Sequence, residues 1–129
     1  MLMSLPLIAI PSKILNMDNH LTAERIANLL DLKGIAFEQK RMFGGDCFMV
    51  DDKMCIGTYK GGIMARIDPI ESETLTQRQS ASQMTHGGKP MKGYLFVEPE
   101  GYDSDIDLGF WVDKCVAFNP KAAASKKKK

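Results

Sequence analysis

The stretch that decides the fold runs from residue 36 to residue 67 and reads AFEQKRMFGGDCFMVDDKMCIGTYKGGIMARI. Short apolar runs alternate in it with glycine pairs and acidic turns, a pattern typical of β-strands joined by tight turns. The pattern predicts four strands, at residues 36–42, 47–50, 54–59 and 63–67. Because the connections are too short for crossovers, the strands should form an antiparallel meander.

The segment before the meander has the spacing of a helix. Apolar residues recur at Leu21, Ile26, Leu29 and Leu30, and Gly34 follows as a stop signal. Asn19 is a good residue to cap the start, so we expect a helix over about residues 20–33.

The segment after the meander is more mixed. A short exposed helix is predicted over residues 70–79, and the Ser, Gln, Gly and Lys content of residues 80–92 predicts a mobile loop. A buried strand at 94–97 and a last helix at 104–118 follow, with Ile106, Phe110, Trp111 or Val112, Cys115 and Phe118 available to the core. The expected class is therefore α+β, with about five antiparallel strands, flanking helices and the order α-β-β-β-β-α-β-α.

Length and composition limit the class of protein. The 129 residues are 44% hydrophobic and 26% charged, which indicates one globular domain and excludes a kinase or a two-domain dehydrogenase. We expect a weakly ordered N-terminal extension at 1–16, a domain at 17–119 and a flexible lysine-rich tail at 120–129. The apolar start is short and contains two prolines, so no membrane span is expected.

The net charge of +1 conceals an asymmetry between the tail and the rest of the chain. The last ten residues hold five lysines, whereas residues 1–120 carry twelve basic and sixteen acidic groups. A domain that binds duplex nucleic acid usually shows a strongly basic face. Nucleic-acid association through the tail and a basic loop is therefore kept only as an alternative hypothesis.

The three cysteines, Cys47, Cys55 and Cys115, form no C-x-x-C pair, which favours buried free thiols in a reducing cytoplasm. Cys47 and Cys55 flank a predicted turn, where they could face one another across a hairpin. The two histidines, His20 and His86, fall outside the predicted strands and join no catalytic motif. The sequence therefore predicts no catalytic residue, no metal and no cofactor.

An acidic triplet at Asp103, Asp105 and Asp107 imitates the start of a calcium loop. The match fails where Leu108 replaces the required glycine and Lys114 replaces the closing glutamate. The alternative is that these acids lie at the first turn of a helix, where its dipole favours negative charge.

A distributed set of basic and aromatic residues suggests a candidate binding surface: Lys40, Arg41, Arg66, Lys89 and Lys92 with Phe43, Tyr59 and Tyr94. Arg41 and Arg66 lie in predicted strands, where an arginine could hold a carboxylate or phosphate; otherwise each pairs with a structural acid such as Asp68 or Glu38. The predicted site residues are Arg41, Phe43, Gly44, Gly45, Arg66, Lys89, Pro90, Met91, Lys92 and Tyr94.

These motifs resemble a known family. The segments RMFGG at 41–45, CFMV at 47–50, RIDP at 66–69 and GKPMKGYLFV at 88–97 resemble the N-terminal domain of the TfoX/Sxy competence regulators of bacteria, over about residues 17–119. The WVDK at 111–114 fits the last helix of that domain. Arg41, Gly44, Gly45, Arg66, Pro90, Lys92 and Gly93 match the motif.

The resemblance implies a secretion-chaperone-like sandwich of an antiparallel sheet and helices, and no catalytic residue is established for the motif. Full-length competence regulators add a C-terminal helical domain that we do not find here, so we expect a stand-alone domain. The expected function is a non-catalytic binding module that acts through protein contacts, including self-association as a homodimer. The alternatives are a nucleic-acid-associated regulator and a small-molecule-binding protein or enzyme.

Overall fold

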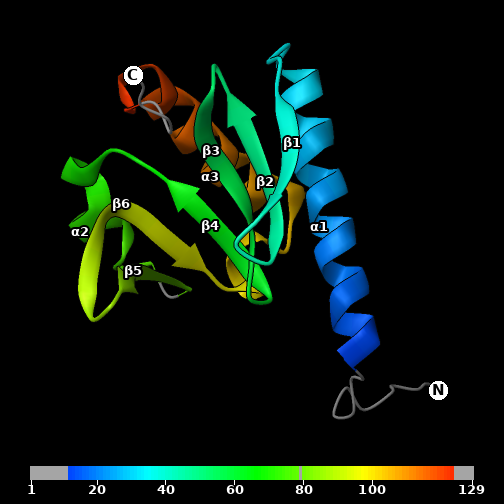
Figure 1. Cartoon of the computed structure of the whole chain (residues 1–129), viewed down its shortest axis with the longest axis horizontal. Coiled ribbons are helices and arrows are strands. Elements are labelled where there is room, and N and C mark those ends of the chain that lie inside the picture. Colours follow the sequence, from blue (N-terminus) through cyan, green and yellow to red (C-terminus); the bar gives the residue numbers. More distant parts are fainter. Residues whose placement is uncertain (1–11, 79, 124–129) are drawn as a thin grey trace.

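The computed structural model describes residues 12–78 and 80–123 and shows a sheet with two long helices packed against it (Figure 1). All six strands are antiparallel to their neighbours, in the order β1-β2-β3-β4-β6-β5. Their bounds are β1 (Glu38–Met42), β2 (Gly45–Val50), β3 (Lys53–Tyr59), β4 (Gly62–Arg66), β5 (Ala81–His86) and β6 (Lys89–Val97). The α+β class is therefore confirmed.

The helices are α1 (Ser12–Leu32), the short α2 (Ser72–Leu75) and α3 (Asp105–Phe118), with 3₁₀ turns before α2, before α3 and after α3. Helix α1 ends where Gly34 adopts a φ of 72° and the Ile35 amide donates to the Leu30 carbonyl at 2.9 Å. Ser104, the predicted first residue of the last helix, is the N-cap of α3, and its hydroxyl accepts a hydrogen bond from the Asp107 amide at 3.0 Å.

The sheet has six strands rather than five, because residues 80–92 are not a loop. They form β5 and the first part of β6, joined by Gly87 and Gly88 at φ values of 62° and 82°. Two consecutive residues with positive φ are typical of the tight turn in a hairpin. The hairpin lies at an edge of the sheet, and on β5 only Ala81 and Met84 are buried. An edge strand of this kind lacks the apolar run by which a strand is recognised.

The predicted helix boundaries also needed correction. Helix α1 begins at Ser12 rather than at residue 20, and the helix expected over residues 70–79 is limited to a 3₁₀ turn (Pro69–Glu71) and α2. In α3, Ile106 is 85% exposed and is not part of the core. The buried side follows a helical period that starts at the overlooked Leu108 and continues through Trp111, Val112 and Cys115.

One face of the sheet is covered by α1 and α3 and holds the main core; we call it the helix-covered face. Phe48, Ile56 and Ile63 of the sheet are completely buried there, together with Ile26 of α1 and Val112 of α3.

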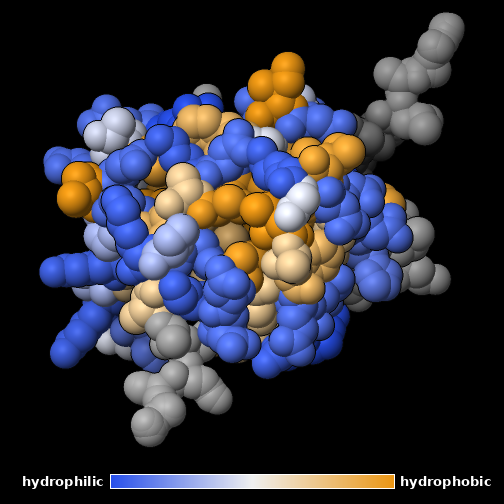
Figure 2. Space-filling view, turned by 90° about the horizontal axis from the view of Figure 1, so that it is seen from above, coloured by the Kyte–Doolittle hydropathy of each residue, from blue (hydrophilic) through white to orange (hydrophobic). Residues whose placement is uncertain are grey.

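Figure 2 views the molecule from the top of Figure 1. Apolar residues gather at the centre of this view, and hydrophilic residues surround them.

An irregularity in β3 decides which side chains reach the helix-covered face. Phe48 pairs with Ile56 and Met49 pairs with Met54, so Cys55 is an extra residue, a β-bulge. Both Cys55 and Ile56 therefore pack on the helix-covered face, while Met54 lies on the other side. Cys47 also lies on that other side, so the idea that Cys47 and Cys55 face one another is wrong.

Candidate functional site

The face of the sheet opposite the long helices is lined by methionine, and we call it the methionine face. Each strand contributes one methionine to the apolar cluster on this face: Met42, Met49, Met54, Met64, Met84 and Met91, in strand order. Cys47 and the aromatic rings of Tyr59, Tyr94 and Phe96 complete the cluster. The Cys47 thiol lies 3.8 Å from the Met49 sulfur. Thioether side chains are flexible and polarizable, so this face is suited to adaptable apolar contacts.

The sheet curls around the methionine face to form a groove. In a flat sheet of six strands, the two edge strands would lie about 24 Å apart, because neighbours are spaced about 4.8 Å. In this sheet, Met42 and Phe43 at the end of the edge strand β1 line the same cavity as Met84 and Thr85 of the other edge strand, β5. The cavity has a volume of about 460 Å³. Its lining is Met42, Phe43, Met54, Tyr59, Met64, Arg66, Met84, Thr85, His86, Met91, Tyr94 and Ala123. We call this cavity the methionine groove.

Arg66, the last residue of β4, brings a positive charge into the lining of the groove. Its guanidinium lies 5.2 Å from the centre of the Tyr94 ring, a cation–π distance, and Tyr94 is its cross-strand partner on β6. Nη1 donates to the Met54 carbonyl at 3.5 Å, a long hydrogen bond. No aspartate or glutamate is among the groove-lining residues of the part of the chain that is described. The groove therefore combines apolar walls with positive charge.

The predicted surface residues separate into three groups. Phe43, Arg66, Met91 and Tyr94 line the groove together. Lys89, Pro90 and Lys92 are exposed on β6 outside the groove lining.

The other residues around the β1–β2 turn have structural roles. Arg41 points away from the groove, because it pairs across β1 and β2 with Asp46, with 3.8 Å between Nη1 and Oδ1. An acid does pair with this arginine, but it is Asp46 rather than Asp68 or Glu38. Gly44 takes a φ of 77° in the turn, and a Cβ at Gly45 would lie only 2.3 Å from the Thr58 carbonyl oxygen. Both glycines thus serve the turn and its close packing.

The prediction missed most of the groove. Met42, Met54, Met64, Met84, Thr85, His86 and Ala123 were not among the predicted site residues. His86 is the last residue of β5 and not a loop residue. In a regular strand, successive side chains alternate between the two faces, which would place Met54 and Tyr59 on opposite faces. The extra residue Cys55 places them on the same face, so the sequence could have predicted this only if the bulge had been recognised.

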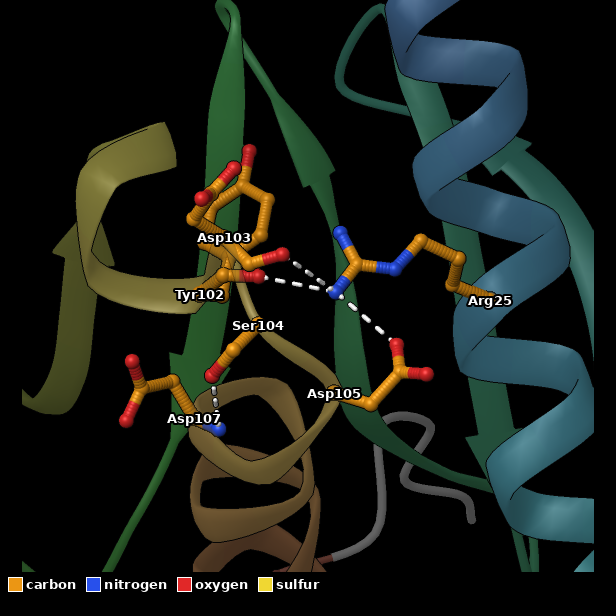
Figure 3. A network of polar contacts seen from close by, with 6 residues as sticks. All are labelled: Arg25, Tyr102, Asp103, Ser104, Asp105 and Asp107. Atoms are coloured by element: carbon orange, nitrogen blue, oxygen red, sulfur yellow. Dashed lines mark hydrogen bonds and ion pairs between the residues drawn. The ribbon is translucent and has the colours of Figure 1, made fainter.

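The acidic triplet lies at the start of α3, next to an arginine (Figure 3). Nη2 of Arg25 in α1 donates to the carbonyls of Tyr102 and Asp103 at 3.0 and 3.1 Å, and to Oδ1 of Asp105 at 3.2 Å. Asp105 and Asp107 belong to the first turn of the helix, as the alternative to a calcium loop predicted. This network joins α1 to α3 and is structural.

All three thiols are buried. All three cysteines are free, and burial raises the pKa of Cys47 to about 11 and the pKa of Cys55 to about 12. Burial also raises the pKa of Cys115 well above its usual value. A thiol with a raised pKa carries little thiolate at neutral pH, so these groups behave as small apolar side chains.

A second cavity of about 560 Å³ lies between the start of β5 and α3 and is more polar. Arg78 covers the Phe110 ring at 4.0 Å, and the carboxylates of Glu98, Glu100 and Asp107 stand around the same hollow. In the described ranges, no three His, Cys, Asp or Glu side chains are arranged so that they could hold a metal ion. The methionine groove differs from this cavity in its mainly apolar walls around Arg66, and we take it as the candidate site.

Across residues 12–78 and 80–123, none of the helices has the length and apolar character needed to cross a bilayer. No curated protein and no solved structure matches the chain. The model of the TfoX N-terminal domain family matches residues 32–119, which include all six strands and α3, while α1 precedes the match except for its last residue. The chain thus belongs to the TfoX N-terminal domain family.

Proposed function

We propose that this protein is a non-catalytic binding module that acts through protein contacts, and that the methionine groove receives an apolar segment of the partner. The observation that supports the proposal is the placement of one methionine from every strand on the face opposite α1 and α3, where Met42 and Met91 are partly exposed and the other four are buried. An internal core that keeps one fixed packing does not need many flexible side chains. A binding surface that must change shape to fit a partner does need them.

The chemistry of the groove walls also favours binding. Thioether and phenylalanine side chains make large apolar contacts and carry no titratable proton. The polar groups of the wall belong to Arg66, Thr85, His86 and the two tyrosines, Tyr59 and Tyr94, and the other lining residues are apolar. Few polar groups in an apolar concave surface are typical of sites that orient a bound molecule.

The proposal is tested by selecting ligands from a phage-displayed library of random peptides on the immobilised full chain. We expect the selected peptides to be rich in Leu, Met, Ile and Phe. A synthetic peptide of the selected sequence, labelled with fluorescein, should bind about tenfold more weakly to Phe43→Glu, because this 58% exposed ring at the groove would be replaced by a charge.

The matched control is Ile106→Glu, which places the same charge at an 85% exposed apolar position of α3. It should leave the affinity unchanged. Failure to select any apolar peptide, or equal weakening by the two variants, would overturn the proposal. Light scattering on the same preparations identifies a second copy of the chain as the partner, if the dimer dissociates in Phe43→Glu and persists in Ile106→Glu.

A further inference from the structure

We infer that the occupant of the methionine groove is an extended peptide that carries a carboxylate beside its apolar side chains, and that Arg66 binds this carboxylate. The inference rests on the proposed function and specifies the chemistry of the partner. Three observations carry it: the bonding of Arg66, the distribution of charge on the methionine face, and the edge strands that border the groove.

Arg66 has binding capacity that the fold does not use. A guanidinium has five N–H donors in a planar fork that matches a carboxylate. Among the residues that the structure describes, the guanidinium makes one hydrogen bond, the 3.5 Å contact with the Met54 carbonyl. The Tyr94 ring under it fixes the position of the guanidinium without occupying its donors. A half-buried cation held in this way is ready to accept an anion.

The charges on the methionine face also favour an anion. Lys40 pairs with Cys47 and so lies on this face, and Nζ of Lys60 lies 5.4 Å from the centre of the Tyr59 ring. Glu38, opposite Met49, places an acid on the same face; like Lys40 and Lys60, it lies outside the groove lining. Arg66 in the groove and the two lysines outside it thus outnumber Glu38 on this face, which favours an acidic segment.

The borders of the groove favour a peptide over a small carboxylic acid. Strands β1 and β5 are the two edges of the sheet, and Met42, Met84 and Thr85 of these strands line the groove. An edge strand has unpaired backbone amides and carbonyls, which an extended peptide can meet with its own backbone while its side chains enter the apolar groove. A fatty acid or a metabolite has no such backbone.

The test uses two fluorescein-labelled synthetic decapeptides with the same Leu-Phe-Leu centre, one followed by two glutamates and the other by two glutamines. Fluorescence anisotropy with the full chain should show about tenfold tighter binding of the acidic peptide, as a charged hydrogen-bonded pair predicts. In Arg66→Met this ratio should fall to about one, because methionine keeps the apolar volume and removes the donors.

Two further variants complete the design. Arg41→Met removes an arginine from the other side of the sheet and should leave the ratio near ten. Arg66→Lys retains the charge without the planar fork and should give an intermediate ratio, which also shows that substitution at residue 66 does not unfold the chain.

The outcomes separate the inference from the function on which it rests. If both peptides bind equally, or if Arg66→Met leaves the ratio at ten, the role of Arg66 is overturned while the apolar groove stands. If neither peptide binds and Phe43→Glu and Ile106→Glu weaken the library-selected peptide equally, both proposals fail.

Discussion

The two faces of this sheet are built from different side chains. The helix-covered face uses mostly β-branched, aromatic and small residues, such as Ile56, Ile63, Ala65 and Phe48, and these are completely buried. The methionine face uses one thioether per strand, and its partly buried members Met42, Met91 and Tyr94 line an open groove.

The difference separates stability from binding. β-Branched side chains have few rotamers and interdigitate in one arrangement, so they specify the fold. Methionine has three rotatable bonds and fills irregular space, so it specifies structure weakly and adapts well. Sheet residues that alternate between the faces, such as Phe48 and Met49, therefore serve two purposes along one strand.

The largest expected effect is on the helix-covered face. Phe48→Ala removes a completely buried ring that also packs edge-on against Phe37, and should lower the free energy of unfolding by about 3–5 kcal/mol. Urea titration measures the loss. Phe43→Ala, at a 58% exposed ring beside the groove, is the control and should change stability by less than about 0.5 kcal/mol. Similar losses in the two variants would show that the faces do not differ in this way.

The thiols allow the two faces to be compared by pH. The folded pKa of Cys47 is about 11 and that of Cys55 is about 12, both above the ordinary value of 9.0. Above pH 9 the unfolded chain releases thiol protons that the folded chain retains, so the free energy of unfolding should fall as pH rises. Each thiol contributes about 1.4 kcal/mol per pH unit while only its unfolded form is ionised.

This decline should continue to about pH 11 for Cys47 and to about pH 12 for Cys55, and it should be smaller in the corresponding Cys→Ala variants. In a thiol-labelling assay at pH 8, Cys47 on the methionine face should react before Cys55. Faster labelling of Cys55, or stability that is constant between pH 8 and pH 11, would contradict the expectation.

A smaller effect is expected where the helical layer is joined at its edge. Arg25→Ala removes the hydrogen bonds from α1 to the start of α3 and should lower the free energy of unfolding by about 1–2 kcal/mol. The loss should be measurable because the arginine side chain is only 29% exposed, and it should stay modest because its partner Asp105 is 86% exposed. Thermal unfolding measures this. Arg41→Ala, whose side chain is 73% exposed, should change stability by less than about 0.5 kcal/mol. A greater loss of stability in Arg41→Ala than in Arg25→Ala would contradict the structural role given to Arg25.

The smallest effect is expected at the centre of the methionine face. Met64→Leu conserves volume and should change the free energy of unfolding by less than about 1 kcal/mol. The same variant should reduce the variety of peptides selected from the library, since leucine is stiffer than methionine. If Met64→Leu were as destabilising as Phe48→Ala, the methionine face would be a second rigid core and not an adaptable surface.

Much of the fold was predictable because its signals are local. The meander from β1 to β4 follows from short apolar runs and turn residues, and Ser104 marked the start of α3. The β5–β6 hairpin was not predicted, because its outer strand is largely exposed and its glycine turn has the composition of a loop. The site was predicted only in part: Phe43, Arg66, Met91 and Tyr94 meet in the groove, while Arg41 is turned to the other face by its register with Asp46.

The sequence by itself determined the class of fold, the order of the first strands, the family and the free state of the cysteines. These depend on the properties of neighbouring residues and on recognisable motifs. Tertiary structure alone decided which methionines share a face and that five of them line a groove. That arrangement depends on the bulge at Cys55, on the side of the sheet that α1 and α3 cover, and on the curvature that brings both edge strands to one cavity. All three arise from packing between distant segments, which no local pattern contains.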